Sequence, residues 1–244
     1  MFIGIGTVIN VLAIAFGALL GVVVGHRLKD RTRVLITDVL GAVTLIGAAS
    51  ALKEVWSDTL NSAVPRGAVI LIVLLSLLLG GLIGSWAKLE ERLENLGHGL
   101  KARFDRGGSS PFVEGFVSAS LIFVIGPLAI LGSISDGMNT GIDQLLLKSI
   151  LDFFASIAFA ATFGWGVALS ALPVGIYQGI WTAIGALLGS VLTSYQVAAM
   201  TATGGILLLG IAFKLLNIKK IEIGNRLPAL ALAPLVALAA HNLL

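Results

Sequence analysis

Residues 3–25 read IGIGTVINVLAIAFGALLGVVVG, an unbroken apolar run without a charged side chain. A helix needs about 20 mostly apolar residues to cross the roughly 30 Å of hydrocarbon in a bilayer. The run is long enough, and it differs from a secretion signal because no basic segment precedes it. This stretch therefore predicts a membrane-spanning helix.

The whole chain has the same character, since 57% of its 244 residues are hydrophobic and only 12% are charged. Soluble domains carry about 25% charged residues, so a sizeable water-soluble domain is excluded. We therefore predict an all-α polytopic membrane protein with about eight transmembrane helices. The eight apolar stretches are 3–25, 34–52, 67–87, 112–133, 143–171, 174–193, 196–216 and 227–244.

The basic residues test this count. Thirteen of the sixteen lysines and arginines fall in three connections that lie on one side of the membrane, whereas the other side receives only Lys53 and Arg66. Because basic residues accumulate on the cytoplasmic side, we expect both termini to lie outside. The thirteen are Arg27, Lys29, Arg31, Arg33, Lys88, Arg92, Lys101, Arg103, Arg106, Lys214, Lys219, Lys220 and Arg226.

The longest connection, 88–111, mixes acidic and basic residues and ends in the glycine- and serine-rich segment 107–111. It predicts a short amphipathic cytoplasmic helix followed by a flexible linker. Its balanced charge excludes a nucleic-acid partner. The chain has no cysteine, and its histidines (His26, His98 and His241) lie far apart, so we predict no metal site and no cofactor.

An internal repeat links the two ends of the chain, because GALLG at 17–21 recurs at 185–189. Further matches are Asn10 with Gln178, Gly41 with Gly204, Gly47 with Gly210, and Pro65 with Pro228. We therefore predict repeat A at 1–87 and repeat B at 172–244, flanking two central spans at 112–171. The matching spans are five apart, so the two copies run in opposite directions, as in many secondary transporters. A duplicated scaffold without transport is the alternative.

Small residues at helical spacing predict close packing of the spans. Packing within the chain is one use of these faces, and a homodimer seam is the other. The small-residue faces are Gly17-xxx-Gly21-xxx-Gly25, Gly80-xxx-Gly84 and Gly185-xxx-Gly189.

The central spans carry the polar residues that are expensive in a membrane. Lys148 and Asp152 are four residues apart, so they share a helix face and can pair, with Ser149 beside them. Asp152 lies nine residues, about 13 Å, below the outer end of its span, and a side chain this short cannot reach water there. We therefore expect Asp152 to face a polar cavity near Gly126 and Pro127, where it serves function; a structural ion pair is the alternative.

Four further residues join this candidate site. The Gly126-Pro127 pair predicts a broken helix whose freed carbonyls bind a cation or solute, or else a simple packing kink. Glu114 is either an intramembrane carboxylate or an acidic residue that suits a helix N-terminus after proline. The repeat-related amides Asn10 and Gln178 either line a shared polar path or bond separate helices.

Several of these motifs resemble those of the YdfK/YqgA-like bacterial membrane proteins, the domain of unknown function 554 family. They are Glu114-Gly115-Phe116, GPLAILGSI at 126–134, KSILD at 148–152, Pro173-Val174 and Tyr177-Gln178-Gly179. The resemblance covers nearly the whole chain and implies a bacterial inner-membrane location and a role in transport. It implies no substrate and no site residues.

Together these patterns favour a membrane transporter or channel for a small solute or ion, surrounded by membrane lipids. A non-transporting membrane scaffold or regulator is the alternative. An intramembrane enzyme is less favoured, because neither HExxH nor GxSxG occurs in the sequence, and we predict that the protein is not an enzyme.

Overall fold

A computed structural model of the protein describes residues 2–65, 67–104, 111–188 and 192–243. Within these ranges the chain is helical and holds no β-strand, which confirms the all-α prediction. Six helical segments are long and apolar enough to cross a membrane, or seven if the bent pair of α6 (Phe112–Val124) and α7 (Pro127–Gly137) counts as one span. The six are Ile5–Gly25, Asp30–Asn61, Ala68–Trp86, Asp143–Phe163, Gly166–Leu187 and Ser194–Leu215.

The eighth predicted span, 227–244, corresponds to α12 (Pro228–Leu243), an apolar helix of 16 residues. This is shorter than the roughly 20 residues of an average crossing. The count of eight therefore stays a prediction.

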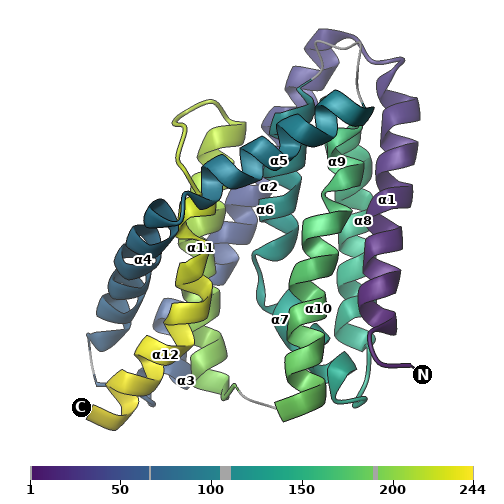
Figure 1. Ribbon diagram of the computed structural model, residues 1–244. Helices are drawn as coiled ribbons and strands as arrows, with labels where there is room; N and C mark the ends of the chain where they lie inside the picture. Colours follow the sequence, from purple (N-terminus) through teal and green to yellow (C-terminus); the bar gives the residue numbers. More distant parts are fainter. Residues whose placement is uncertain (1, 66, 105–110, 189–191, 244) are drawn as a thin grey trace. The chain divides into compact units, whose positions relative to one another are not determined.

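The described residues form two compact units, the first made of residues 1–40 and 93–191. In this unit α1 runs beside α8 and α10 (Figure 1). The elements of the unit are α1 (Ile5–Gly25), the first half of α2 (Asp30–Leu52), most of α5 (Leu89–Phe104), α6 (Phe112–Val124), α7 (Pro127–Gly137), α8 (Asp143–Phe163), α9 (Gly166–Leu169) and α10 (Ala171–Leu188).

Glycines set the contact between α1 and α8. Gly17, Gly21 and Gly25 lie directly against the carbonyl oxygens of Phe153, Ile157 and Ala161, respectively. The residue numbers of these contacts rise together along α1 and α8, so the two helices are parallel. This packing within the chain is one of the two uses predicted for the small-residue faces, and the homodimer stays a prediction.

Two breaks interrupt the helices of the first unit. The first lies where the sequence predicts it: α6 ends at Val124, Gly126 has a φ of 148°, and α7 begins at Pro127, with a bend of 63° between the two helices. The second corrects a predicted boundary, because α8 ends at Phe163 and not at residue 171. Gly164 follows it with a φ of 76°, a left-handed backbone that stops the helix.

The second unit consists of residues 41–92 and 192–244. Its buried core includes Leu60, Ile72, Ala199 and Ala237. The elements are the second half of α2, η1 (Lys53–Trp56), α3 (Asp58–Asn61), α4 (Ala68–Trp86), the first turn of α5, α11 (Ser194–Leu215), η2 (Gly224–Arg226) and α12.

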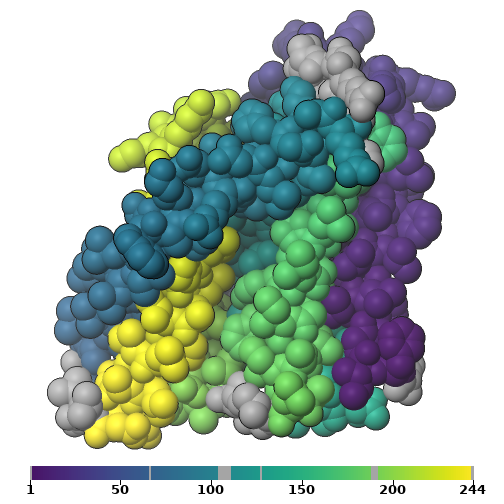
Figure 2. Space-filling model, in the orientation of Figure 1, coloured from purple at the N-terminus to yellow at the C-terminus, as the bar shows by residue number. Residues whose placement is uncertain are grey.

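In this unit α12 packs along α4, as Figure 2 shows. Gly80 of α4 lies against Ala229, and Gly84 lies against Asn225. The residue numbers of the contacts rise along α4 and fall along α12, so the two helices are antiparallel.

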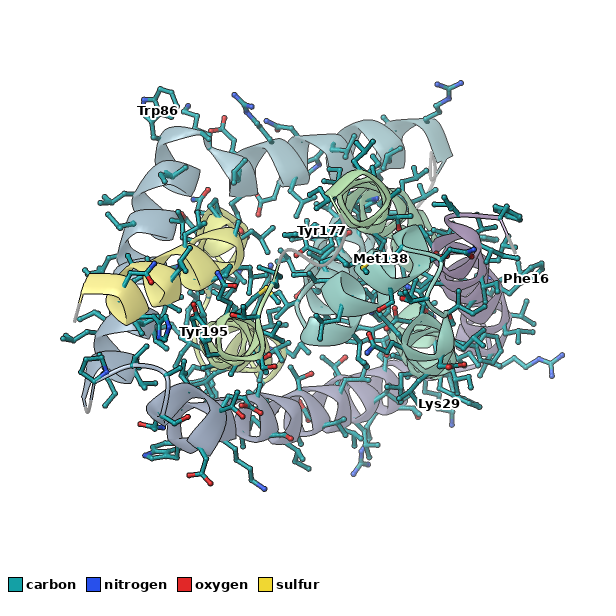
Figure 3. All side chains as sticks on the ribbon, turned by 90° about the horizontal axis from the view of Figure 1, so that it is seen from below. Phe16, Lys29, Trp86, Met138, Tyr177 and Tyr195 are labelled. Carbon is teal, nitrogen blue, oxygen red and sulfur yellow. The ribbon has the colours of Figure 1, made fainter. Side chains whose placement is uncertain are left out.

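Large apolar side chains cover the outer faces of several helices. Phe16 is 59% exposed and Trp86 is 88% exposed, and Figure 3 shows both pointing outward. Such faces suit contact with lipid, and a tryptophan at the end of a span suits the membrane interface. The predicted connecting helix is found as α5, whereas its predicted linker at 107–110 and Gly189 of the second GALLG copy lie outside the described residues.

Candidate functional site

Lys148 and Asp152 form an ion pair in the first half of α8. The distance between Lys148 Nζ and Asp152 Oδ2 is 2.6 Å, and each side chain is only 9% exposed. They lie four residues apart on one helix, and both are surrounded by apolar spans. The i, i+4 pairing expected from the sequence is therefore present.

Two amides from other helices complete this network. Asn10 Nδ2 of α1 donates to Asp152 Oδ2 at 3.0 Å and to Gln178 Oε1 of α10 at 3.3 Å. Both amide side chains have no exposed surface. Asp152 thus lies where three helices meet, and the two amides that the predicted repeat matches contact each other there. We call Asn10, Lys148, Asp152 and Gln178 the amide–ion-pair cluster.

The directions of the helices explain why these residues meet. Thr7 of α1 contacts Thr182 of α10 at 3.3 Å between hydroxyl oxygens, and Asn10 contacts Gln178 one turn further along. The numbers rise along α1 as they fall along α10, so these two helices are antiparallel (Figure 1). Their polar faces meet at one level of the parallel helix α8, which supplies Asp152.

The charges of the cluster cancel within a short distance. Asp152 Oδ2 accepts from both an ammonium and an amide group, which offsets part of the cost of burying the carboxylate. Lys148 Nζ lies 6.0 Å from the centre of the Phe123 ring, at the edge of the range for a cation–π contact. Phe123 belongs to the last turn of α6, so α6 approaches the ion pair just before its break.

The other predicted site residues lie apart from this network. Glu114 is exposed in the first turn of α6, as the helix N-terminus interpretation expects. The Ser149 hydroxyl donates to the Leu145 carbonyl of its own helix. Gly126 and Pro127 form the break itself, and Phe123, just before it, lies next to Lys148.

Asp136 of α7 is a buried carboxylate that the sequence interpretation missed. Its oxygens accept from the backbone N–H groups of Gly4 at 3.2 Å, Gly6 at 3.0 Å and Thr7 at 3.4 Å. These are the unpaired donors that begin α1, and a carboxylate is their preferred partner. A signal was present, because Asp136 ends an otherwise uncharged apolar segment after Pro127.

No group of three or more metal-ligating side chains occurs among the described residues. The cluster instead offers hydrogen-bond donors, acceptors and one neutralised ion pair. Such groups can bind a small polar species through hydrogen bonds.

Comparison with known proteins adds the family. Residues 5–238 match the pattern of the family described as Protein of unknown function (DUF554). The chain belongs to the DUF554 family. This confirms the resemblance seen in the sequence motifs.

Two relatives match over nearly their full length. The uncharacterized membrane protein YdfK of Bacillus subtilis (strain 168) is 29% identical over 236 residues, which cover 97% of this chain and 96% of the relative. The uncharacterized protein YqgA of Escherichia coli (strain K12) is 31% identical over 234 residues, 94% of each chain. No solved structure matches the chain. One of these DUF554 relatives, YdfK, is thus named a membrane protein, and neither name gives an activity.

Proposed function

We propose that this protein is an integral membrane transporter or channel for a small solute or ion. Its site is the amide–ion-pair cluster of Asn10, Lys148, Asp152 and Gln178. The observation that carries the proposal is the burial of two charges and two amides between apolar helices. Each charge at the centre of a span costs about 2.5–3.5 kcal/mol on insertion scales, and such residues mark substrate and ion pathways.

The predicted inverted repeat supports this proposal through paired contacts. In the first unit α1 and α10 are antiparallel, and in the second unit so are α4 and α12. Gly41 of α2 packs against Leu216 of α11, and Gly205 of α11 packs against Leu52 of α2. If Gly41 corresponds to Gly204, the predicted repeat maps the contact between Gly41 and Leu216 onto residues 204 and 53. Each of these positions is one residue away from the observed contact between Gly205 and Leu52.

We further propose eight spans, with the bent pair α6 and α7 as the fourth and α12 as the eighth. Both termini then lie outside a bacterial inner membrane, with the basic connections in the cytoplasm. The parallel and antiparallel pairs described above support this count, because it requires spans one and five to run in the same direction and span six to run in the opposite one.

A non-transporting membrane scaffold or regulator is the second candidate. One observation favours it: the Lys148–Asp152 pair is closed at 2.6 Å, as a purely structural ion pair would be. We propose no enzymatic activity in either case.

Flux through proteoliposomes tests the proposal. The purified protein is reconstituted, and the uptake of Na⁺, K⁺ and Cl⁻ and the swelling caused by urea, acetamide and glycerol are measured. We expect flux of at least one probe, lost in Asp152→Asn and retained in Asp143→Asn. Asp143 is a matched control because it is an exposed aspartate in the first turn of the same helix.

The variant Lys148→Met/Asp152→Asn separates function from folding, because it removes both charges and leaves neither unpaired. Transport predicts that this double variant is stable and inactive. Normal flux in Asp152→Asn together with lower thermal stability would identify a structural ion pair. Absence of flux for every probe in the unmodified protein would contradict the proposal.

A further inference from the structure

Two polar atoms of the amide–ion-pair cluster have no hydrogen-bond partner among the described residues. They are Asn10 Oδ1, an acceptor, and Gln178 Nε2, a donor. The carboxylate of Asp152 determines this arrangement, because only the NH₂ group of Asn10 can donate to it. The same NH₂ group donates to Gln178 Oε1, which leaves the NH₂ group of Gln178 free.

The free donor and acceptor lie where bulk water does not reach. Both side chains are 0% exposed, and α1, α8 and α10 enclose them. An unpaired buried polar group is unfavourable, and native structures satisfy nearly all such groups with protein, water or ligand. Two complementary free groups on adjacent side chains therefore match a ligand that both donates and accepts hydrogen bonds.

The charges around these atoms select against an ion. A cation attracted to Asn10 Oδ1 would meet the NH₂ group of Gln178 and the ammonium of Lys148. An anion attracted to Gln178 Nε2 would meet the carboxylate of Asp152 and the carbonyl of Asn10. Because Lys148 and Asp152 already neutralise each other at 2.6 Å, the cluster provides no net charge to replace the hydration of an ion.

We infer that Asn10 and Gln178 bind a small uncharged solute that carries a donor beside an acceptor, as a primary amide, urea or an alcohol does. The solute donates to Asn10 Oδ1 and accepts from Gln178 Nε2. The Lys148–Asp152 pair holds the Asn10 amide in the required orientation and is not itself a ligand. This inference rests on the proposed transport function and specifies its substrate class.

Further polar groups extend from this site in one direction. One turn toward the N-terminal end of α1, the hydroxyls of Thr7 and Thr182 face each other at 3.3 Å, and both residues are buried. In the other direction Gly17 and Gly21 press against backbone carbonyls of α8, with the buried side chain of Ser156 beside Gly17, and the two backbones leave no room there even for an added methyl group. An uncharged solute would therefore reach the amides along the threonine hydroxyls, from the side of the N-terminus.

Stopped-flow light scattering of proteoliposomes tests the inference with urea and acetamide as the probes, alongside Na⁺ and Cl⁻ uptake. We expect urea or acetamide to cross, and Na⁺ and Cl⁻ not to cross. Gln178→Leu should reduce the rate about tenfold, the effect expected of one lost hydrogen bond. Gln144→Leu is the matched control, because Gln144 is an exposed amide on α8.

A second variant guards against misfolding. Gln178→Glu keeps an oxygen that accepts from Asn10 and replaces the free NH₂ donor with a second, negatively charged acceptor, so it should show the same loss. Folding of each variant is checked by size-exclusion chromatography and thermal stability in detergent.

The possible results separate this inference from the proposed function. Flux of Na⁺ or Cl⁻ that depends on Asp152, without urea or acetamide flux, would overturn the inference and leave transport standing. Faster water flow alone would show that water occupies the amides, which also overturns it. Urea or acetamide flux at an unchanged rate in Gln178→Leu would reject Gln178 as a ligand. No flux of any probe would remove the proposed function, and with it the inference.

Discussion

At the scale of single residues, Asp152 receives two hydrogen bonds on one oxygen, from Lys148 and from Asn10. Burial makes each partner dependent on the other, because neither charge can be solvated alone. Removing one member of a buried ion pair costs about 3–5 kcal/mol, whereas replacing both members is often neutral. The two charges therefore act as one unit in stability.

We accordingly expect Asp152→Asn and Lys148→Met each to lower the free energy of unfolding by about 3 kcal/mol. The double variant should recover most of this loss, because it leaves no unpaired charge. Unfolding in mixed detergent micelles, followed by circular dichroism, measures all four proteins. Losses that simply add in the double variant would show that the two side chains do not interact.

At the scale of elements, α1 has two different halves. Its first half presents Thr7 and Asn10 to α10 and α8, and its second half presents Gly17, Gly21 and Gly25 to α8. The glycines let the two backbones touch where lipid provides no hydrophobic drive between helices. This close contact sets the level at which Asn10 meets Asp152.

A methyl group on Gly21 would overlap the carbonyl oxygen of Ile157. We expect Gly21→Ala to lower the free energy of unfolding by about 1–3 kcal/mol, as overpacking does. Gly47→Ala is the matched control, since nothing lies within 4 Å of the added methyl group there. The control should be neutral or stabilising by up to about 1 kcal/mol, because alanine favours helix. Equal thermal stability of Gly21→Ala and the unmodified protein would contradict the close contact.

At the scale of the whole molecule, each of the two units takes helices from both predicted repeats. The first unit holds α1 and α10, and the second holds α4, α11 and α12. Topology is then the property that most directly tests the eight-span proposal, because one span more or fewer would move the basic connections to both sides.

The chain has no cysteine, so the labelling of a single introduced cysteine shows on which side of the membrane that position lies. We expect cysteines at Asp58 and Thr140 to react with an impermeant maleimide from the outside of intact cells. Cysteines at Arg103 and Lys219 should react only after the membrane is opened. All four positions are exposed. Labelling of Thr140 and Arg103 from the same side would exclude the proposed topology.

The sequence by itself determined the features that depend on neighbouring residues. Apolar runs of span length predicted the helices, and the Gly126-Pro127 pair predicted the break, because backbone sterics are local. The spacing of Lys148 and Asp152 predicted their pairing, since helical periodicity places residues four apart on one face. The same local reasoning failed at Phe163. The apolar sequence continues to residue 171, but the positive φ of Gly164 ends the helix after Phe163.

Only the tertiary structure decided what meets Asp152. Asn10 is 142 residues away from it along the chain, and Asn10 is 168 residues away from Gln178. Asp136 binds Gly6 across 130 residues. Local periodicity gives the face of a helix that a residue occupies, but the partner of that face depends on how the backbones pack. Here glycine contacts between α1 and α8 and the antiparallel crossing of α1 and α10 set that packing, so these helices bring the amides to the carboxylate.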